Sequence, residues 1–209
     1  IYSVTVPGAV DGWFTVLEKY GTMSMAEVLE PAIYYAENGF PVTEVIAGEW
    51  KNAKDVLISH MSASKSYLID GKAPRPGQVF KNKDLAQTYH KIAREGIETF
   101  YEGEICKAMV DFSRQNGGLI SYKDFKAHTT SWVDPISTDY RGYTIFELPP
   151  NGQGITALEM LNILEGYDIA RLGHNSSEYL HLLIEAKKIA FTDRDYFVTD
   201  PEFESIPAG

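Results

Sequence analysis

The sequence has 209 residues, the length of one large domain or of part of a bigger one. Hydrophobic residues make up 44% and aromatic residues 12%, so the chain can build a core and does not have the composition of a disordered polypeptide. The formal net charge of −10 argues against binding to nucleic acid or to an anionic membrane, because both need clustered Lys and Arg.

An internal disulfide, a membrane-spanning segment and a signal peptide are each disfavoured by one feature of the sequence. Cys106 is the only cysteine, so no disulfide can form within the chain. No apolar run approaches the roughly 18 residues of a membrane helix, so no membrane segment is expected. Residues 1–13 have neither the basic region nor the long apolar region of a signal peptide. Both ends of the sequence have the character of cuts in a longer protein.

The first elements are predicted from alternation and from helix-capping residues. Residues 1–6 alternate enough for a short strand, and an apolar segment then closes at Gly21. Ser24 followed by Glu27 forms a capping box, which predicts a helix from about Met25 to Glu37. A further helix is expected from Glu44 to about Ser59.

The middle of the chain is predicted to be helical after one long connection. Residues 60–83 carry turn signals and little periodicity, which indicates an extended surface connection. Asn82 can cap a helix that places Leu85, Tyr89, Ile92 and Ala93 on one face. A short helix ending at Gly117-Gly118 and a turn of helix at residues 121–128 follow.

The last third combines two strands with two helices. Residues 132–150 are rich in β-branched and aromatic residues, with Asp139 to Gly142 as the turn between two strands. Helices are expected at residues 154–165 and about 176–192. The sum is an α+β, helix-rich chain with too little sheet to close a compact α/β domain by itself. No internal domain boundary is predicted within residues 1–209.

The stretch Asn151–Gly154 could be a ligand-binding loop or a structural corner. A phosphate-binding loop needs either a third glycine in the dinucleotide pattern or a Lys after the second, and the sequence "GQGITA" has neither. Gly152 and Gly154 permit a tight strand-to-helix turn, which favours the corner.

Three other polar groups are weighed as sites. Thr129-Thr130-Ser131 offers hydroxyl nucleophiles next to His128, but a threonine needs an adjacent base or its own free amine, so a polar connection is favoured. His181 and Glu185 supply two metal ligands where zinc takes three or four, so pairing on the helix surface with Lys188 and Thr192 is favoured. Asn175 or Ser176 is expected to cap that helix, although Asn175-Ser176-Ser177 also matches a glycosylation acceptor.

The histidines give no further site. They are scattered along the chain without recognisable metal-ligand spacing, at positions 60, 90, 128, 174 and 181. No metal and no cofactor are therefore expected.

Six blocks of sequence, in this order and spacing, resemble the γ-glutamyltransferase family from about Val6 to Phe203. The blocks are "VPGAVDGW", "LEPAIYYAENGFPV", "NKDLAQTYHKIAREGIETFYEGEI", "NGGLISYKDF", "DYRGYTIFELPPNGQGITALEMLNILEGYD" and "HLLIEAKKIAFTDRDYFVTDPEF". Six ordered blocks are far more specific than any one of the short motifs above.

The resemblance implies a fold and a chemistry. Family members are N-terminal nucleophile hydrolases with an α/β/β/α sandwich, and their precursor cuts itself before a threonine into a large and a small subunit. The new N-terminal Thr supplies a nucleophilic hydroxyl and an amine that acts as base. It attacks a γ-glutamyl amide and passes the acyl group to water, an amino acid or a peptide. Backbone amides stabilise the oxyanion.

The resemblance assigns no catalytic, substrate-binding or metal residue to this chain. The matched blocks correspond to the middle and later part of the large subunit, and the family's nucleophilic Thr lies beyond the position of Gly209. Thr129-Thr130 precedes Pro149-Pro150, whereas the family nucleophile follows that block. The chain alone is therefore expected to be inactive, with the small subunit of the same precursor as its partner.

Three questions stay open at this point. The family segment usually reads Ser-Ser-Gly-Gly where this chain has Asn151-Gly152-Gln153-Gly154, which is closer to the acylase-like bacterial branch and leaves glutathione open as substrate. A non-catalytic scaffold with a binding role is the alternative function. The resemblance suggests a periplasmic or secreted protein, and the cytoplasm is also possible.

Overall fold

The computed structural model describes residues 1–206, and these residues form two compact units. The first unit is Ile1–Thr130 and the second begins at Ser131. The sequence predicts that residues 1–209 belong to one large-subunit region without an internal boundary. The two units describe how the chain packs, so that expectation stays a prediction.

The first unit is built mainly from helices, several of which begin at a side-chain cap. Ser24 and Glu27 form the predicted capping box, in which the Ser24 backbone N–H donates to Glu27 Oε2 over 2.7 Å. Asn82 Oδ1 accepts from the Leu85 N–H over 3.0 Å. In chain order the elements are α1 (Ala9–Tyr20), α2 (Met25–Asn38), β1 (Phe40–Pro41), α3 (Glu44–Asn52), α4 (Lys54–Ser59), α5 (Met61–Tyr67), β2 (Val79–Phe80), α6 (Lys83–Glu95), α7 (Glu98–Tyr101), α8 (Glu104–Gln115) and α9 (Tyr122–Ala127).

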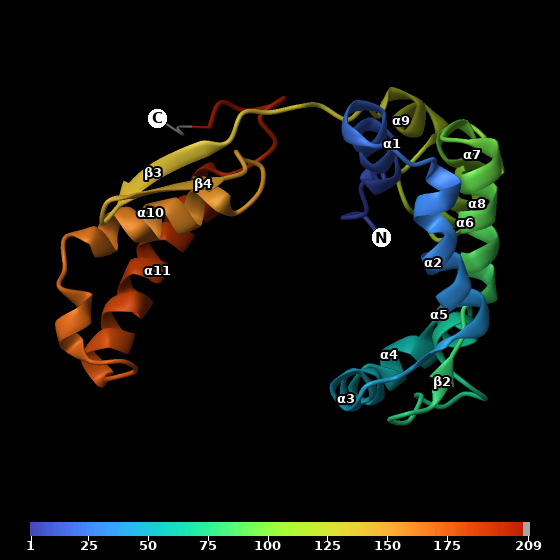
Figure 1. Ribbon diagram of the computed structural model, residues 1–209, viewed down its shortest axis with the longest axis horizontal. Helices are drawn as coiled ribbons and strands as arrows, with labels where there is room; N and C mark the ends of the chain where they lie inside the picture. Colours follow the sequence, from blue (N-terminus) through green and yellow to red (C-terminus); the bar gives the residue numbers. More distant parts are fainter. Residues whose placement is uncertain (207–209) are drawn as a thin grey trace. The chain divides into compact units, whose positions relative to one another are not determined.

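One apolar core joins most of these helices. Helices α2 and α6 lie side by side (Figure 1), and Ile33 of α2 and Ile92 of α6 are both buried in the core. Phe125 of α9 is 1% exposed and Cys106 of α8 is fully buried. Because α9 has only six residues, burial of Phe125 rather than helix propensity holds it in place.

A smaller cluster surrounds the short sheet of the first unit. Strands β1 and β2 are antiparallel, with Phe40 opposite Phe80. Phe80 and Val42 are buried, and Trp50 of α3 packs on Phe80 with ring centroids 4.6 Å apart. This contact ties α3 to the sheet.

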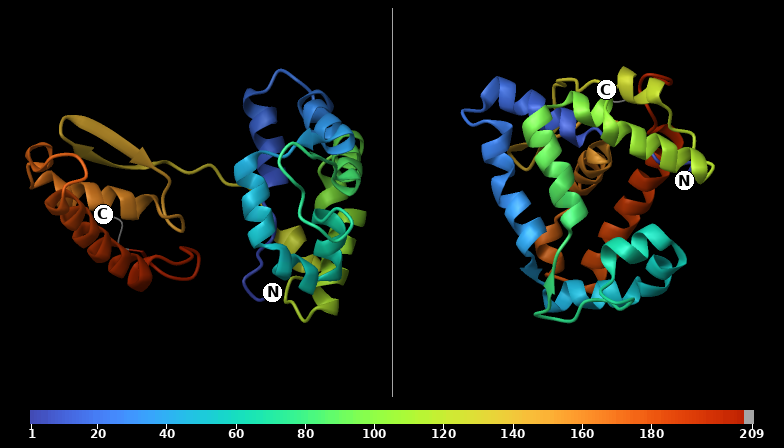
Figure 2. Two further views of the ribbon diagram at one scale, coloured as in Figure 1. Left: turned by 90° about the horizontal axis from the view of Figure 1, so that it is seen from below. Right: turned by 90° about the vertical axis from the view of Figure 1, so that its right-hand side faces the viewer.

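The second unit is a hairpin packed on two helices. Its elements are β3 (Ile136–Tyr140), β4 (Tyr143–Glu147), α10 (Gly154–Glu165), the 3₁₀ turn η1 (Ile169–Leu172) and α11 (Ser177–Phe197). The hairpin lies along α10, and α10 packs on α11 (Figures 1 and 2). Strand pairing runs from Ile136 opposite Glu147 to Tyr140 opposite Tyr143. Ala186 and Ala190 are the buried residues of α11.

The hairpin turn is tighter than the predicted turn from Asp139 to Gly142. Tyr140 and Tyr143 are already paired, so Arg141 and Gly142 alone make the turn. Their φ angles are 52° and 84°, the left-handed conformation that two-residue hairpins require.

Other predicted boundaries need correction. Residues 1–6 form no strand, because no part of the described chain offers them a pairing partner. Residues 60–83 are not one extended connection but contain α5 and β2. The helix expected from Glu44 to Ser59 is interrupted at Ala53, and α11 runs five residues past the predicted end at Thr192. No helix among residues 1–206 is both long and apolar enough to span a membrane.

Candidate functional site

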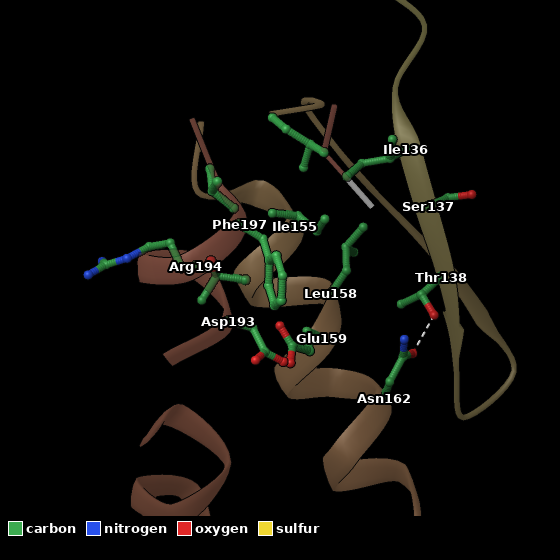
Figure 3. Close-up of a pocket in the computed structure, with 13 residues that line it drawn as sticks. Ile136, Ser137, Thr138, Ile155, Leu158, Glu159, Asn162, Asp193, Arg194 and Phe197 are labelled. Carbon is green, nitrogen blue, oxygen red and sulfur yellow. Dashed lines mark hydrogen bonds between the residues drawn. The ribbon is translucent and has the colours of Figure 1, made fainter. Parts of the chain in front are cut away.

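The second unit contains a cavity of about 380 Å³ between the hairpin and the two long helices (Figure 3). Ile155, Leu158, Glu159 and Asn162 follow the i, i+3, i+4, i+7 pattern of one helix face, so α10 presents them together. The cavity is lined by Ile136, Ser137, Thr138, Ile155, Thr156, Leu158, Glu159, Asn162, Asp193, Arg194, Phe197, Val198 and Ile206.

Two carboxyl groups meet in this cavity. Glu159 of α10 and Asp193 of α11 lie next to each other (Figure 3), within hydrogen-bonding reach. Partial burial, the hydrogen bond with Asp193 and the charge of Asp193 together raise the pKa of Glu159 from 4.5 to about 7. At neutral pH the pair therefore holds a proton for part of the time.

Hydroxyl groups also line the cavity. The Thr138 hydroxyl of β3 is hydrogen-bonded to the Asn162 side chain of α10, which fixes the hairpin against the helix. Thr156 is 3% exposed, and its Oγ1 has no hydrogen-bond partner among the described residues. A buried hydroxyl without a hydrogen-bond partner is costly, so Thr156 is a polar group that lowers the stability of this part of the unit.

Arg194, the positively charged residue that lines the cavity, contacts side chains other than the carboxyl pair. Arg194 donates from Nε and Nη2 to Asp195 Oδ1 over 2.9 and 2.6 Å, and from Nη1 to Gln153 Oε1 over 3.2 Å. Its guanidinium also lies over the Phe191 ring, 4.2 Å from the centroid. In Figure 3 it points away from Glu159 and Asp193. Arg194 therefore does not neutralise the carboxyl pair.

The stretch Asn151–Gly154 forms a tight corner between β4 and α10. A Cβ on Gly154 would lie 2.6 Å from the Leu148 carbonyl oxygen and 2.7 Å from Glu147 Cβ. Gly152 has open space, with its nearest neighbour 3.9 Å from an added Cβ. Close packing at Gly154 supports the structural interpretation.

His128 and Thr130 lie beside Asp11 in the first unit. The Thr130 N–H donates to Asp11 Oδ2 over 2.5 Å, and His128 Nε2 is 3.8 Å from the same oxygen. The His128 ring stacks on Tyr101 with centroids 5.4 Å apart. No hydrogen bond in the described chain joins His128 to the hydroxyl of Thr129 or Thr130, so the geometry supports the structural interpretation of this segment.

The polar stripe on α11 is a set of surface contacts. Lys188 Nζ donates to Glu185 Oε1 over 2.9 Å, and the Thr192 hydroxyl donates to the Lys188 carbonyl. No group of three potential metal ligands exists among residues 1–206, including around His181. At the start of α11, Ser176 Oγ accepts from the Tyr179 N–H over 3.1 Å, so Ser176 is the cap.

The sequence analysis missed Glu159 and Asp193. They are 34 positions apart and match no short motif. The available signal was the helical spacing itself, which places an acidic side chain beside Ile155 and Leu158 on one face of α10. The position of the Asp193 carboxyl group beside Glu159 depends on how α11 packs on α10. The helical spacing within α10 does not determine that packing.

The sequence pattern of the gamma-glutamyltranspeptidase family matches residues 1–209. The chain is 45% identical to the "Glutathione hydrolase-like YwrD proenzyme" of Bacillus subtilis (strain 168), over 98% of this chain and 39% of that protein. It is 38% identical to the crystal structure of cephalosporin acylase from Bacillus halodurans, with a TM-score of 0.88 over 98% of this chain and 39% of the other. It is 31% identical to gamma-glutamyltranspeptidase from Helicobacter pylori, with a TM-score of 0.90 over 99% of this chain and 60% of the other.

These matches confirm the predicted α+β fold class, a helix-rich part of an N-terminal nucleophile hydrolase. The chain spans about two fifths of the length of the Bacillus subtilis relative. Because the sequence pattern of one family covers every residue, and the solved structures agree with it along nearly the whole chain, this chain belongs to the gamma-glutamyltranspeptidase family.

Proposed function

We propose that this chain is the large-subunit portion of a γ-glutamyltransferase or related amidohydrolase, which transfers or hydrolyses a γ-glutamyl group. The observation that carries the proposal is the family match over residues 1–209 in a chain that spans 39% of a proenzyme relative. The nucleophilic threonine belongs to the part of the protein outside this chain. The partner is the small subunit from the same precursor.

In this proposal the side chains of the described residues stabilise the fold and do not catalyse the reaction. An activated threonine needs a base within hydrogen-bonding reach, or its own free amine. Thr130 is held through its backbone N–H by Asp11. Ser137, Thr138 and Thr156 line the cavity with Glu159 and Asp193, and none of them has a free N-terminal amine. The isolated chain is therefore inactive in this proposal.

We propose that the parent protein belongs to the acylase-like branch of the family and acts on a substrate of that branch. The identity is 45% to a glutathione hydrolase-like proenzyme, 42% to an acylase proenzyme of Pseudomonas sp. (strain V22) and 34% to a glutathione hydrolase proenzyme of Escherichia coli (strain K12). The Asn151–Gly154 corner points the same way, because it replaces the usual Ser-Ser-Gly-Gly of the family. An acyl amide without a γ-glutamyl group is then a candidate substrate beside γ-glutamyl amides such as glutathione.

The test compares the purified 209-residue chain with its full-length parent, using a chromogenic γ-glutamyl anilide and a second chromogenic amide that lacks the γ-glutamyl group. We expect no turnover by the chain and turnover of at least one substrate by the parent. Hydrolysis by the chain would contradict the scaffold role. Failure of the parent on both substrates would favour the non-catalytic homologue.

A further inference from the structure

The backbone of β4 has hydrogen-bonding groups that point away from the hairpin. In an antiparallel pair, residues that exchange hydrogen bonds with the partner strand alternate with residues whose N–H and C=O groups point outward. Tyr140 and Tyr143 flank the two-residue turn and form a hydrogen-bonded pair, so Thr144 and Phe146 point outward along the free edge of β4. No other backbone hydrogen bond within residues 1–206 uses these outward groups.

The opposite edge, along β3, has features that prevent pairing with a further strand. Pro135, which has no N–H, comes directly before β3, and Asp134 and Asp139 carry negative charges. Proline and charged side chains commonly protect the edge of a sheet from other strands. Ser137 of β3 also lines the cavity together with Ile206, so a later segment of the chain already borders this side of the hairpin. The β3 edge is therefore an unsuitable place for a further strand.

The free edge of β4 has no such protection. The sequence from Tyr143 to Phe146 contains no proline and no charged residue, and its β-branched and aromatic residues favour a strand. Tyr143, Phe146 and Leu148 are 75%, 63% and 69% exposed. The charged Glu147 packs against the start of α10, because a Cβ on Gly154 would lie 2.7 Å from Glu147 Cβ. Strand β4 therefore exposes apolar side chains and unpaired backbone groups together.

A further strand would satisfy both features of β4 at once. A helix over Phe146 would cover its ring but would leave the outward N–H and C=O groups without partners, because a helix makes its backbone hydrogen bonds within itself. A strand beside β4 bonds to these groups and places its own side chains next to Phe146. The occupant that fits this edge is therefore an extended segment with an apolar residue next to Phe146.

We propose that the free edge of β4 pairs with an extended segment of the parent protein outside residues 1–209, and that this segment bonds to the backbone of Thr144 and Phe146. The matched part is 39% of the Bacillus subtilis relative, so a parent of that length has other segments that can supply the strand. The inference rests on the proposed function only in taking the chain as part of a longer protein. It makes the hairpin part of a larger sheet that is completed when the parent protein folds.

The direct test is an experimental structure of the full-length parent. We expect the backbone nitrogen or oxygen of Phe146 to lie about 2.7–3.2 Å from a backbone oxygen or nitrogen of a strand outside residues 1–209, the usual range for such a hydrogen bond. An edge of β4 that faces solvent, that a helix covers, or that pairs with residues 1–209 or with a second copy of the protein would overturn the proposal.

A second test removes the outward N–H of Phe146 in the full-length parent. Phe146→Pro and Phe146→Ala both lose the aromatic ring, but only proline also loses the N–H. Because that N–H is not used inside the hairpin, β4 tolerates proline at this position unless a further strand pairs with it. We expect the Tm of Phe146→Pro to lie about 2–4 °C below that of Phe146→Ala, which corresponds to one lost hydrogen bond.

The control is the same pair of substitutions at Ser137, which lies opposite Phe146 and also points its N–H outward. The Tm values of Ser137→Pro and Ser137→Ala should differ by less than those of the Phe146 variants. Equal differences at the two positions would overturn the proposal. If Phe146→Pro does not fold, hydrogen exchange of the Thr144 and Phe146 amides in the unmodified parent decides, because slow exchange supports pairing and rapid exchange contradicts it.

These tests are independent of the proposed function. They measure structure, stability and exchange, so none requires an active enzyme. A parent that lacks amidohydrolase activity but has a further strand beside β4 would contradict the proposed function and support the pairing site. An active parent in which the edge of β4 faces solvent would do the reverse.

Discussion

The Tyr101 hydroxyl donates a 2.7 Å hydrogen bond to the carbonyl oxygen of Pro7, 94 residues earlier in the chain. The same hydroxyl accepts a 3.1 Å hydrogen bond from the Asp11 N–H. Tyr101 is 7% exposed, and burial raises its pKa above the usual 10.0 although the Asp11 N–H acts in the opposite direction. One side chain thus fixes the segment before α1 to the core of the first unit.

Replacing Tyr101 by phenylalanine should destabilise the chain while keeping its ring in the core. The Pro7 carbonyl and the Asp11 N–H lose their partner, and each net hydrogen bond contributes about 1 kcal/mol, so we expect a loss of roughly 1–3 kcal/mol. The measurement is the midpoint of urea unfolding. Tyr143→Phe, at a side chain that is 75% exposed, is the control and should shift the midpoint little. Equal midpoints for the two variants would contradict the role given to Tyr101.

The corner before α10 can be tested with a pair of neighbouring glycines. An alanine Cβ at position 154 would lie 2.6 Å from the Leu148 carbonyl oxygen, whereas one at position 152 has no atom closer than 3.9 Å. Overpacking of this kind costs about 1–3 kcal/mol, so Gly154→Ala should lower the stability clearly and Gly152→Ala should not. Thermal unfolding followed by circular dichroism measures both. Two equally mild variants would mean that the corner tolerates a side chain.

The carboxyl pair predicts a pH dependence for the 209-residue chain on its own. The pKa of Glu159 is raised from 4.5 to about 7 on folding, so its contribution is fully present below about pH 4.5 and is lost as the pH rises through about 7. Glutamine at this position stays neutral. The stability of Glu159→Gln relative to the unmodified chain should therefore increase from pH 4.5 to pH 7.

Urea unfolding at several pH values measures this difference. A difference that stays constant over the range would show that Glu159 does not share a proton with Asp193.

The isolated chain should self-associate, because apolar side chains on α11 face solvent. Ile184 and Phe197 are 55% and 52% exposed, and Tyr196 is 80% exposed. Exposed patches of this kind favour association. Light scattering should detect particles larger than a monomer, and Ile184→Lys should reduce their amount. Thr192→Lys adds the same charge at an exposed polar position and should have a smaller effect. A monodisperse monomer would contradict the prediction.

The sequence predicted the helices that carry strong local signals. Ser24 and Asn82 satisfy backbone N–H groups at the helix starts, and Gly117-Gly118 stops α8, so these boundaries depend on neighbouring residues alone. It failed for α5, which has no side-chain cap and no buried residue. The main contacts of α5 are with α4, and hydrophobic periodicity does not predict such a helix.

The candidate site was less predictable than the fold. The family resemblance assigned no catalytic residue to the chain. The short motifs indicated candidate sites at Thr129 and Asn151 instead. Glu159 and Asp193 become neighbours only when α10 and α11 pack together.

We propose that this chain forms part of a self-processing amidohydrolase whose nucleophile lies elsewhere in the same precursor. The most direct measurement is mass spectrometry with N-terminal sequencing of the purified full-length parent. We expect two polypeptides, of which the larger contains the 209 residues described here and the smaller begins with threonine. A single uncleaved polypeptide, or a smaller piece that begins with a residue unable to act as a nucleophile, would contradict the claim.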